Sequence, residues 1–250
     1  MSGSSMTVYA PVGVEAELDA FEFSSEELVI VEESKRARIV CIIPAYNEAE
    51  TIEDVLQGLL AQTRLPDAVH VIINNSSDNS FELARAYAGE YSVERHGEIQ
   101  NTAIYVHDMG KVPDKKVGAL NYGFRLAEGA DFLLGVDGDT VMSPDALELM
   151  EAEITSDPRI GGISAIYTVD NHTRNPVASL LLTGQRAQFA AFNLQNLLRG
   201  RNMAVLGGQS SIFRMSALRE VMAQYHQDTP WVSDSEVEDS PLSLQIKNLG

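Results

Sequence analysis

The 250-residue chain carries 18 basic and 36 acidic side chains, which gives a formal charge of −18. Such a chain lacks the basic face of a general nucleic-acid-binding protein, and charge alone does not draw it to anionic lipid. Hydrophobic residues make up 44% of the chain, enough for a sizeable core, so a fully disordered chain is excluded. The single cysteine, Cys41, excludes an internal disulfide framework and a cysteine zinc site.

The negative charge is concentrated at the N-terminus. Residues 1–33 hold eight acids and no Lys or Arg. We expect residues 1–36 to form a solvated acidic arm, with a specific docking arm as the alternative. No signal peptide opens the chain, and no run of about 18 apolar residues suggests a transmembrane segment. We therefore expect a cytoplasmic protein, and leave peripheral association with a membrane open.

After the arm, short β-branched apolar runs alternate with segments of helical periodicity. This alternation indicates βαβ units and a mostly parallel α/β sheet, followed by a less regular second half. The strands expected are 39–43, 68–73, 103–106, 132–136, 161–168 and 205–214. The helices expected are 51–60, 80–88, 117–127, a helix starting near Ser143, 175–199, 216–225 and 240–249.

Polar residues follow three of these strands. They are Tyr46-Asn47-Glu48, Asn74–Asp78 and Asp137–Asp139. In open parallel sheets, ligands bind outside the carboxyl ends of the strands. The sequence therefore predicts a functional site at this edge of the sheet.

Asp137-Gly138-Asp139 is the first candidate motif. Alternate residues of an extended chain point the same way, so the two carboxylates converge, and the glycine admits a ligand close to the backbone. Such oxygen ligands suit Mg²⁺ or Mn²⁺, which keep phosphate and water as further ligands. The alternative is a turn with helix-capping acids.

Lys116 and Glu238-Asp239 are the other candidates. Lys116 stands just before a predicted helix, where backbone N–H groups already favour an anion such as diphosphate. Asp239 lies on a loop and could serve as a general base. The alternatives are a solvated surface lysine and an ordinary acid at a helix start.

Several enzyme classes lack their motifs. No G-x-G-x-x-G follows the first strand, and no G-x-x-x-x-G-K-[ST] is present, which disfavours dinucleotide-binding enzymes and P-loop NTPases. Neither a nucleophile elbow nor H-E-x-x-H spacing occurs.

Taken together, the motifs resemble those of family-2 glycosyltransferases with the GT-A fold, most closely the polysaccharide-synthase-like branch. The resemblance implies an α/β, Rossmann-like, mostly parallel central sheet flanked by helices in a single catalytic domain, residues 37–250. Within it, 37–140 would be the nucleotide-sugar-binding half and 141–250 the acceptor half. The matching stretches, in the family's order, are Val40–Glu48, Asn74–Asp78, Lys116–Asn121, Val136–Asp139, Gly207–Arg214 and Glu238–Leu242.

The resemblance also implies roles. A sugar would move from a nucleoside-diphosphate sugar, with UDP-sugar favoured, to a hydroxyl of a glycan, lipid-linked or protein acceptor with inversion. Asp137 and Asp139 would hold Mn²⁺ or Mg²⁺ with the diphosphate, and Asp239 would be the general base. The implied donor-binding residues are Pro44, Ala45, Tyr46, Glu48, Asn74, Lys116, Asp137 and Gly138. The implied acceptor-binding residues are Gly208, Gln209, Trp231 and Glu238.

Three departures from the family pattern keep alternatives open. Asn74 stands where the family often has an acid, no Gln-x-x-Arg-Trp motif is present, and the chain stops soon after Asp239. We therefore expect a domain truncated at its C-terminus. One alternative is a catalytically impaired nucleotide-sugar-binding protein. The other is a sugar nucleotidyltransferase, which would need a Gly-rich basic loop in place of Pro44–Glu48.

Overall fold

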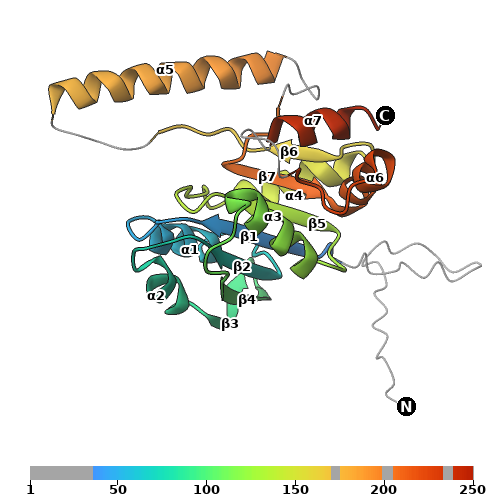
Figure 1. The fold of residues 1–250 in the computed structure, drawn as a ribbon, viewed down its shortest axis with the longest axis horizontal. Coiled ribbons are helices and arrows are strands. Elements are labelled where there is room, and N and C mark those ends of the chain that lie inside the picture. Colours follow the sequence, from blue (N-terminus) through green and yellow to red (C-terminus); the bar gives the residue numbers. More distant parts are fainter. Residues whose placement is uncertain (1–35, 170–174, 199–204, 233–238, 250) are drawn as a thin grey trace, which may run out of the picture. The chain divides into compact units, whose positions relative to one another are not determined.

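The computed structural model describes residues 36–169, 175–198, 205–232 and 239–249. The chain divides into two units, 1–35 and 36–250, so the acidic arm lies outside the described residues. The described residues of the second unit form a seven-stranded sheet of order β3-β4-β2-β1-β5-β7-β6 (Figure 1).

The centre of the sheet is parallel, as predicted. Strand β1 (Ile39–Ala45) lies between β2 (Ala68–Ile73) and β5 (Phe132–Val136), and β4 (Glu98–Asp108) pairs with β2 on the far side. The strand expected at 103–106 is thus the second half of a longer strand. Two antiparallel strands, β7 (Ser210–Arg214) and β6 (Gly162–Ser164), complete the other edge.

One strand was missed by the sequence reading. Strand β3 (Gly89–Arg95) pairs antiparallel with β4 through the two-residue turn His96-Gly97, where both residues have positive φ, 51° and 81°. Positive φ at both central positions is typical of the type I′ turns that join hairpin strands. The strand lies at the sheet edge and is largely exposed, so it lacks the apolar run that identified its neighbours.

Helices cover both faces of the sheet, because the central strands are buried on both sides. On one face lie α1 (Ile52–Leu60), α2 (Ser80–Arg85) and α4 (Ala146–Ser156). The other face carries α3 (Lys115–Leu126), α6 (Met215–Tyr225) and α7 (Asp239–Lys247).

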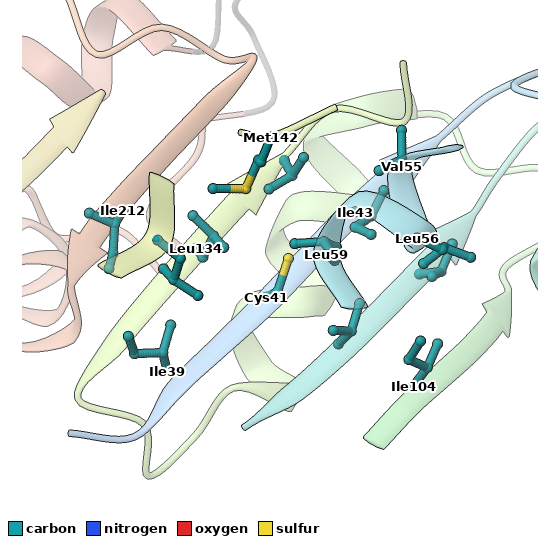
Figure 2. Close-up of a cluster of buried hydrophobic side chains, with 14 of the residues drawn as sticks. Ile39, Cys41, Ile43, Val55, Leu56, Leu59, Ile104, Leu134, Met142 and Ile212 are labelled. Atoms are coloured by element: carbon teal, nitrogen blue, oxygen red, sulfur yellow. The ribbon is translucent and has the colours of Figure 1, made fainter. Parts of the chain in front are cut away.

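Alternate residues of β1 serve the two cores. Ile39, Cys41 and Ile43 lie on the face of the sheet that α1 covers, in one core with Leu56 and Leu59 (Figure 2). Val40 and Ile42 face α3 in the second core. Cys41 is fully buried, and burial raises the pKa of its thiol, so it is an inert core residue.

The long helix predicted at 175–199 forms as α5 (Pro176–Leu198). One side of it contacts residues 167–169: Asn193 Nδ2 donates to the Tyr167 carbonyl at 2.8 Å, and Phe189 lies edge-on to the Tyr167 ring. Several of its large apolar side chains are exposed, with Leu180 73% and Leu198 80% accessible. Within the described ranges, no helix is long and apolar enough to cross a membrane.

Candidate active site

The candidate site lies where β1, β2 and β5 end side by side. Hydrogen bonds join the first two loops: Asn47 N–H donates to Ser76 Oγ at 3.0 Å, and Ser77 N–H donates to Asn47 Oδ1 at 2.8 Å. Glu48 N–H donates to Ser80 Oγ at 2.8 Å. Two of the predicted polar clusters are therefore one connected surface.

The loop after β5 joins the same surface through Thr51. The Thr51 hydroxyl lies 2.9 Å from the Gly138 carbonyl oxygen and 3.0 Å from Glu48 Oε2. Thr51 stands at the N-cap position of α1, but it makes no side-chain capping bond there. The hydroxyl instead ties two loops together across 87 residues of sequence.

Gly138 is required by packing between these loops. A Cβ at this position would lie 2.8 Å from Glu48 Cγ and 3.3 Å from Ala45 Cβ. The glycine thus allows Glu48 to lie against the Asp137-Gly138-Asp139 turn. Its role in this arrangement is close packing of protein against protein.

The carboxylates at this edge have different surroundings. Asp137 is half-buried, and its Oδ1 lies 2.9 Å from Lys116 Nζ. Asp139 is exposed. The pKa of Glu48 is raised, chiefly by burial and further by the negative charges of Asp139, Asp137 and Asp78, although a hydrogen bond from Thr51 opposes the shift. The site therefore concentrates negative charge that a cation would relieve.

The donor set suits a divalent cation that is shared with phosphate. In the parts of the chain that are described, no group of three His, Cys, Asp or Glu residues is arranged to enclose a metal ion. Mg²⁺ and Mn²⁺ prefer oxygen ligands and commonly bind through one or two carboxylates plus phosphate and water. The neighbouring carboxylates of Asp137 and Asp139 fit that requirement.

Lys116 enters the site from the first turn of α3. The preceding residue, Lys115, has a φ of 46°, and its carbonyl accepts a hydrogen bond from Asn74 Nδ2 at 2.8 Å. Asn74 is only 2% exposed, so its amide holds the start of α3. Sequence reasoning did not anticipate this contact, and the expected contact of Asn74 with a nucleotide base stays a prediction.

A small pocket lies beside Lys116. Its lining includes Gly208 and Trp231, two of the residues expected to bind the acceptor. Trp231 is 2% exposed and packs edge-on against Phe213, with ring centroids 5.9 Å apart. It is therefore a wall residue without an open face for stacking in this structure. The remaining lining residues are Lys116, Leu120, Gly135, Gly207, Ser211 and Phe213.

The other expected site residues are distributed unevenly. Pro44 and Ala45 are buried at the end of β1, whereas Tyr46 is 59% exposed on the loop that follows. The backbone carbonyl of Gln209 accepts a hydrogen bond from Asp137 N–H at 3.0 Å, which places Gln209 beside the acidic turn.

The expected catalytic pair, Glu238 and Asp239, falls at the edge of the described residues. Glu238 lies outside the described residues, and of Asp239 only the backbone, as the first residue of α7, is described. The roles expected for both residues therefore stay predictions.

The fold and the site together define a class. A mostly parallel sheet that is covered by helices on both faces, with polar loops at its carboxyl edge, is the arrangement of the GT-A glycosyltransferases. The family model described as "Glycosyl transferase family 2" matches residues 40–222, so the chain belongs to that family.

Curated relatives support the same assignment. The chain is 27% identical over 212 residues to the poly-beta-1,6-N-acetyl-D-glucosamine synthase of Staphylococcus aureus (strain COL), covering 83% of this chain and 45% of the relative. Identity to the Staphylococcus epidermidis synthase is 25% over 229 residues, covering 90% and 49%. The chain thus spans about half the length of the curated relatives it matches.

Solved structures share the fold. The mannosyltransferase PcManGT of Pyrobaculum calidifontis, in complex with GDP-Man and Mn²⁺, superposes with a TM-score of 0.59 at 22% identity, over 87% of this chain and 54% of that one. S. aureus TarS in complex with UDP-GlcNAc gives 0.55 at 18% identity, over 84% and 53%. At these identities the likeness shows the GT-A fold alone, which confirms the predicted architecture.

Proposed function

We propose that this chain catalyses inverting, metal-dependent transfer of a sugar from a nucleoside-diphosphate sugar to an acceptor hydroxyl. The observation that carries the proposal is the pairing of Lys116 with Asp137 at 2.9 Å, beside Asp139, at the end of β5. The ammonium group of Lys116 can bind a diphosphate, and the two carboxylates at the strand end can bind a divalent metal ion. The complexes of PcManGT with GDP-Man and of TarS with UDP-GlcNAc support a nucleotide-sugar donor, and UDP-sugar remains our favoured donor.

The donor half supplies positive charge for the leaving group. Lys116 and the N–H groups of the first turn of α3 attract the diphosphate. Asp137 and Asp139 would hold Mn²⁺ or Mg²⁺, and the bound ion would act as a Lewis acid on the departing diphosphate. Pro44, Ala45, Tyr46 and Glu48 would border the nucleotide.

The acceptor half supplies the base. Asp239 takes the proton of the acceptor hydroxyl. The hydroxyl oxygen of the acceptor attacks the anomeric carbon from the side opposite the diphosphate. The new carbon–oxygen bond forms as the bond to the diphosphate breaks, so one displacement inverts the configuration. Glu238 orients the acceptor, a glycan, lipid-linked or protein hydroxyl. We place the reaction in the cytoplasm, with peripheral membrane association open.

Release of nucleoside diphosphate from UDP-GlcNAc and GDP-Man, with Mn²⁺ and then with excess chelator, tests the proposal. We expect metal-dependent release that falls at least about 100-fold in Asp139→Asn and in Asp239→Asn. Glu128→Gln, which removes an exposed carboxylate just after α3, is the matched control and should keep the wild-type rate. Unchanged rates in both aspartate variants would contradict the mechanism.

The hydrogen bond of the buried Asn74 amide favours a second candidate function. In it, the protein binds nucleotide sugars without turning them over. The buried amide is committed to Lys115, where the family often presents a charged acid. Calorimetry would then show donor binding, with no product from any acceptor. A sugar nucleotidyltransferase gains no support, because the loop after β1 offers Tyr46-Asn47-Glu48 and no basic residue.

A further inference from the structure

Asn121 of α3 joins a distant part of the chain through both ends of its side-chain amide. Asn121 Nδ2 donates to the Trp231 carbonyl at 2.8 Å, and Trp231 N–H donates to Asn121 Oδ1 at 3.2 Å. The two residues are 110 positions apart. The side chain thus satisfies both backbone groups of a half-buried segment, as a neighbouring strand would.

The same helix also holds the lysine of the candidate donor site. Lys116 and Leu120 line the small pocket together with Trp231. The start of α3 is fixed by the bond from Asn74 to Lys115, and Lys116 is paired with Asp137. Asn121 lies one turn further along α3. The helix is therefore bound to the β2 loop at its start and to the Trp231 segment at its middle.

Trp231 is held on its other sides as well. Its ring packs edge-on against Phe213 of β7, and the Thr229 hydroxyl lies 3.3 Å from its carbonyl oxygen. Trp231 precedes Asp239, the proposed base, by eight positions. The segment fixed by Asn121 is therefore the one that leads into α7.

We propose that Asn121 is a positioning residue that holds the Trp231 segment in register with Lys116, so that the acceptor side of the site is set relative to the donor diphosphate. The inference rests on the proposed function. The Asn121 amide is bonded to Trp231, and Asn121 lies five positions after Lys116 along α3, so we expect its loss to spare donor binding. Loss of its amide leaves the Trp231 N–H without its acceptor and the Trp231 carbonyl with only the longer contact to the Thr229 hydroxyl, which favours a displaced segment that water can reach. Turnover falls as a result.

The single tryptophan of the chain makes this testable, because fluorescence excited selectively at tryptophan, and not at the eight tyrosines, reports on Trp231 alone. We compare wild type, Asn121→Ala and Asn121→Asp for acrylamide quenching, and for UDP-GlcNAc affinity and turnover with Mn²⁺. Asn121→Asp keeps an acceptor for the Trp231 N–H and loses the donor to its carbonyl, so it provides a second variant that retains one of the two bonds. Asn101→Ala, which removes an exposed amide bonded to Ser92, is the control.

We expect stronger quenching in both variants, a donor Kd within about threefold of wild type, and turnover reduced at least about tenfold. The control should match wild type in each measurement. Unchanged quenching together with unchanged turnover would overturn the inference. A donor affinity that falls in step with turnover would overturn it too, because Asn121 would then act in donor binding.

The two proposals fail in different ways. If the wild-type chain neither binds nor turns over a nucleotide sugar, the proposed function fails. Quenching that still rises in the Asn121 variants would then show that the Asn121 clamp holds Trp231 in place. If wild type is active and the variants keep full turnover with a looser Trp231, only the positioning role fails.

Discussion

At the scale of single residues, the site depends on contacts that leave no room for additional atoms. Gly138 carries the carbonyl that Thr51 approaches, and the space a side chain would need is filled by Glu48. Sequence reasoning chose this glycine for its position between two aspartates and gave it a ligand-facing purpose. The structure assigns it a packing purpose as well, because Glu48 comes from a loop 90 residues away and leaves no mark on the local pattern.

We therefore expect Gly138→Ala to destabilise the fold by about 1–3 kcal/mol and to lower turnover, since the added methyl group displaces Glu48 or the acidic turn. Denaturant unfolding and donor turnover measure the two effects. Gly184→Ala is the matched control: nothing lies within 4 Å of the added Cβ, and alanine in a helix interior should be neutral or stabilising by up to about 1 kcal/mol. Equal stability of Gly138→Ala and wild type would refute the packing argument.

At the scale of elements, the start of α3 connects the strand-end loops to the pocket. Its first turn presents Lys116 to the half-buried carboxylate of Asp137, while Lys115 beside it is exposed. A lysine before a predicted helix was a weak signal, because the same position is most often a solvated surface residue. Lys116 differs from a solvated lysine because β5 brings Asp137 Oδ1 within 2.9 Å of its Nζ. The helical periodicity of the sequence does not predict this contact.

Lys116→Met should weaken binding of UDP and GDP at least about tenfold, because the diphosphate loses the lysine charge and Asp137 loses its ion pair with Lys116. Lys115→Met removes the same charge one residue earlier and should keep wild-type affinity. Isothermal calorimetry at two salt concentrations compares them, with a smaller salt dependence expected for Lys116→Met. Equal affinity in the two variants would argue that the lysine charge does not contact the diphosphate.

At the scale of the whole molecule, a buried imidazole pair ties β2 to β4. His70 Nδ1 lies 3.0 Å from His107 Nε2, and the His70 ring stacks on Tyr105. Burial lowers the pKa of His70 from 6.5 to about 4, with smaller contributions from His107 and Arg38. Burial also lowers the pKa of His107. His70 lies within the strand predicted at 68–73, and its packing gives it a structural role.

The unfolded chain therefore binds a proton at His70 below about pH 6.5 that the folded chain accepts only near pH 4. The stability that His70 contributes is complete above pH 6.5 and is lost as the pH falls towards 4. We expect about 2 kcal/mol of acid destabilisation from this group, and a shallower slope in His70→Gln. Urea unfolding at pH 7.5 and 5 compares the variant with wild type. If the free energy of unfolding falls equally with pH in wild type and in His70→Gln, His70 is not buried as a neutral ring.

How much of the fold and site could be predicted follows from what is local in the sequence. The apolar runs of β1, β2 and β5 and the polar residues after them are short continuous patterns, and parallel pairing brings their ends to one edge. The exposed strand β3 was not predicted because it lacks such a run. The dipeptide His96-Gly97 was the available indication of a hairpin turn. The apolar stripe of α5 predicted a helix correctly, but its exposure could not be read from its period.

The sequence by itself thus determined the class of fold, the family and the edge of the sheet where the acids and the lysine meet. These features follow from apolar runs and motifs that are local in the sequence. Tertiary structure alone decided the partners: Thr51 with Gly138, Asn74 with Lys115, and Asn121 with Trp231. Each pair joins residues 41 to 110 positions apart. Only the packing of elements around the sheet brings such side chains within hydrogen-bonding distance.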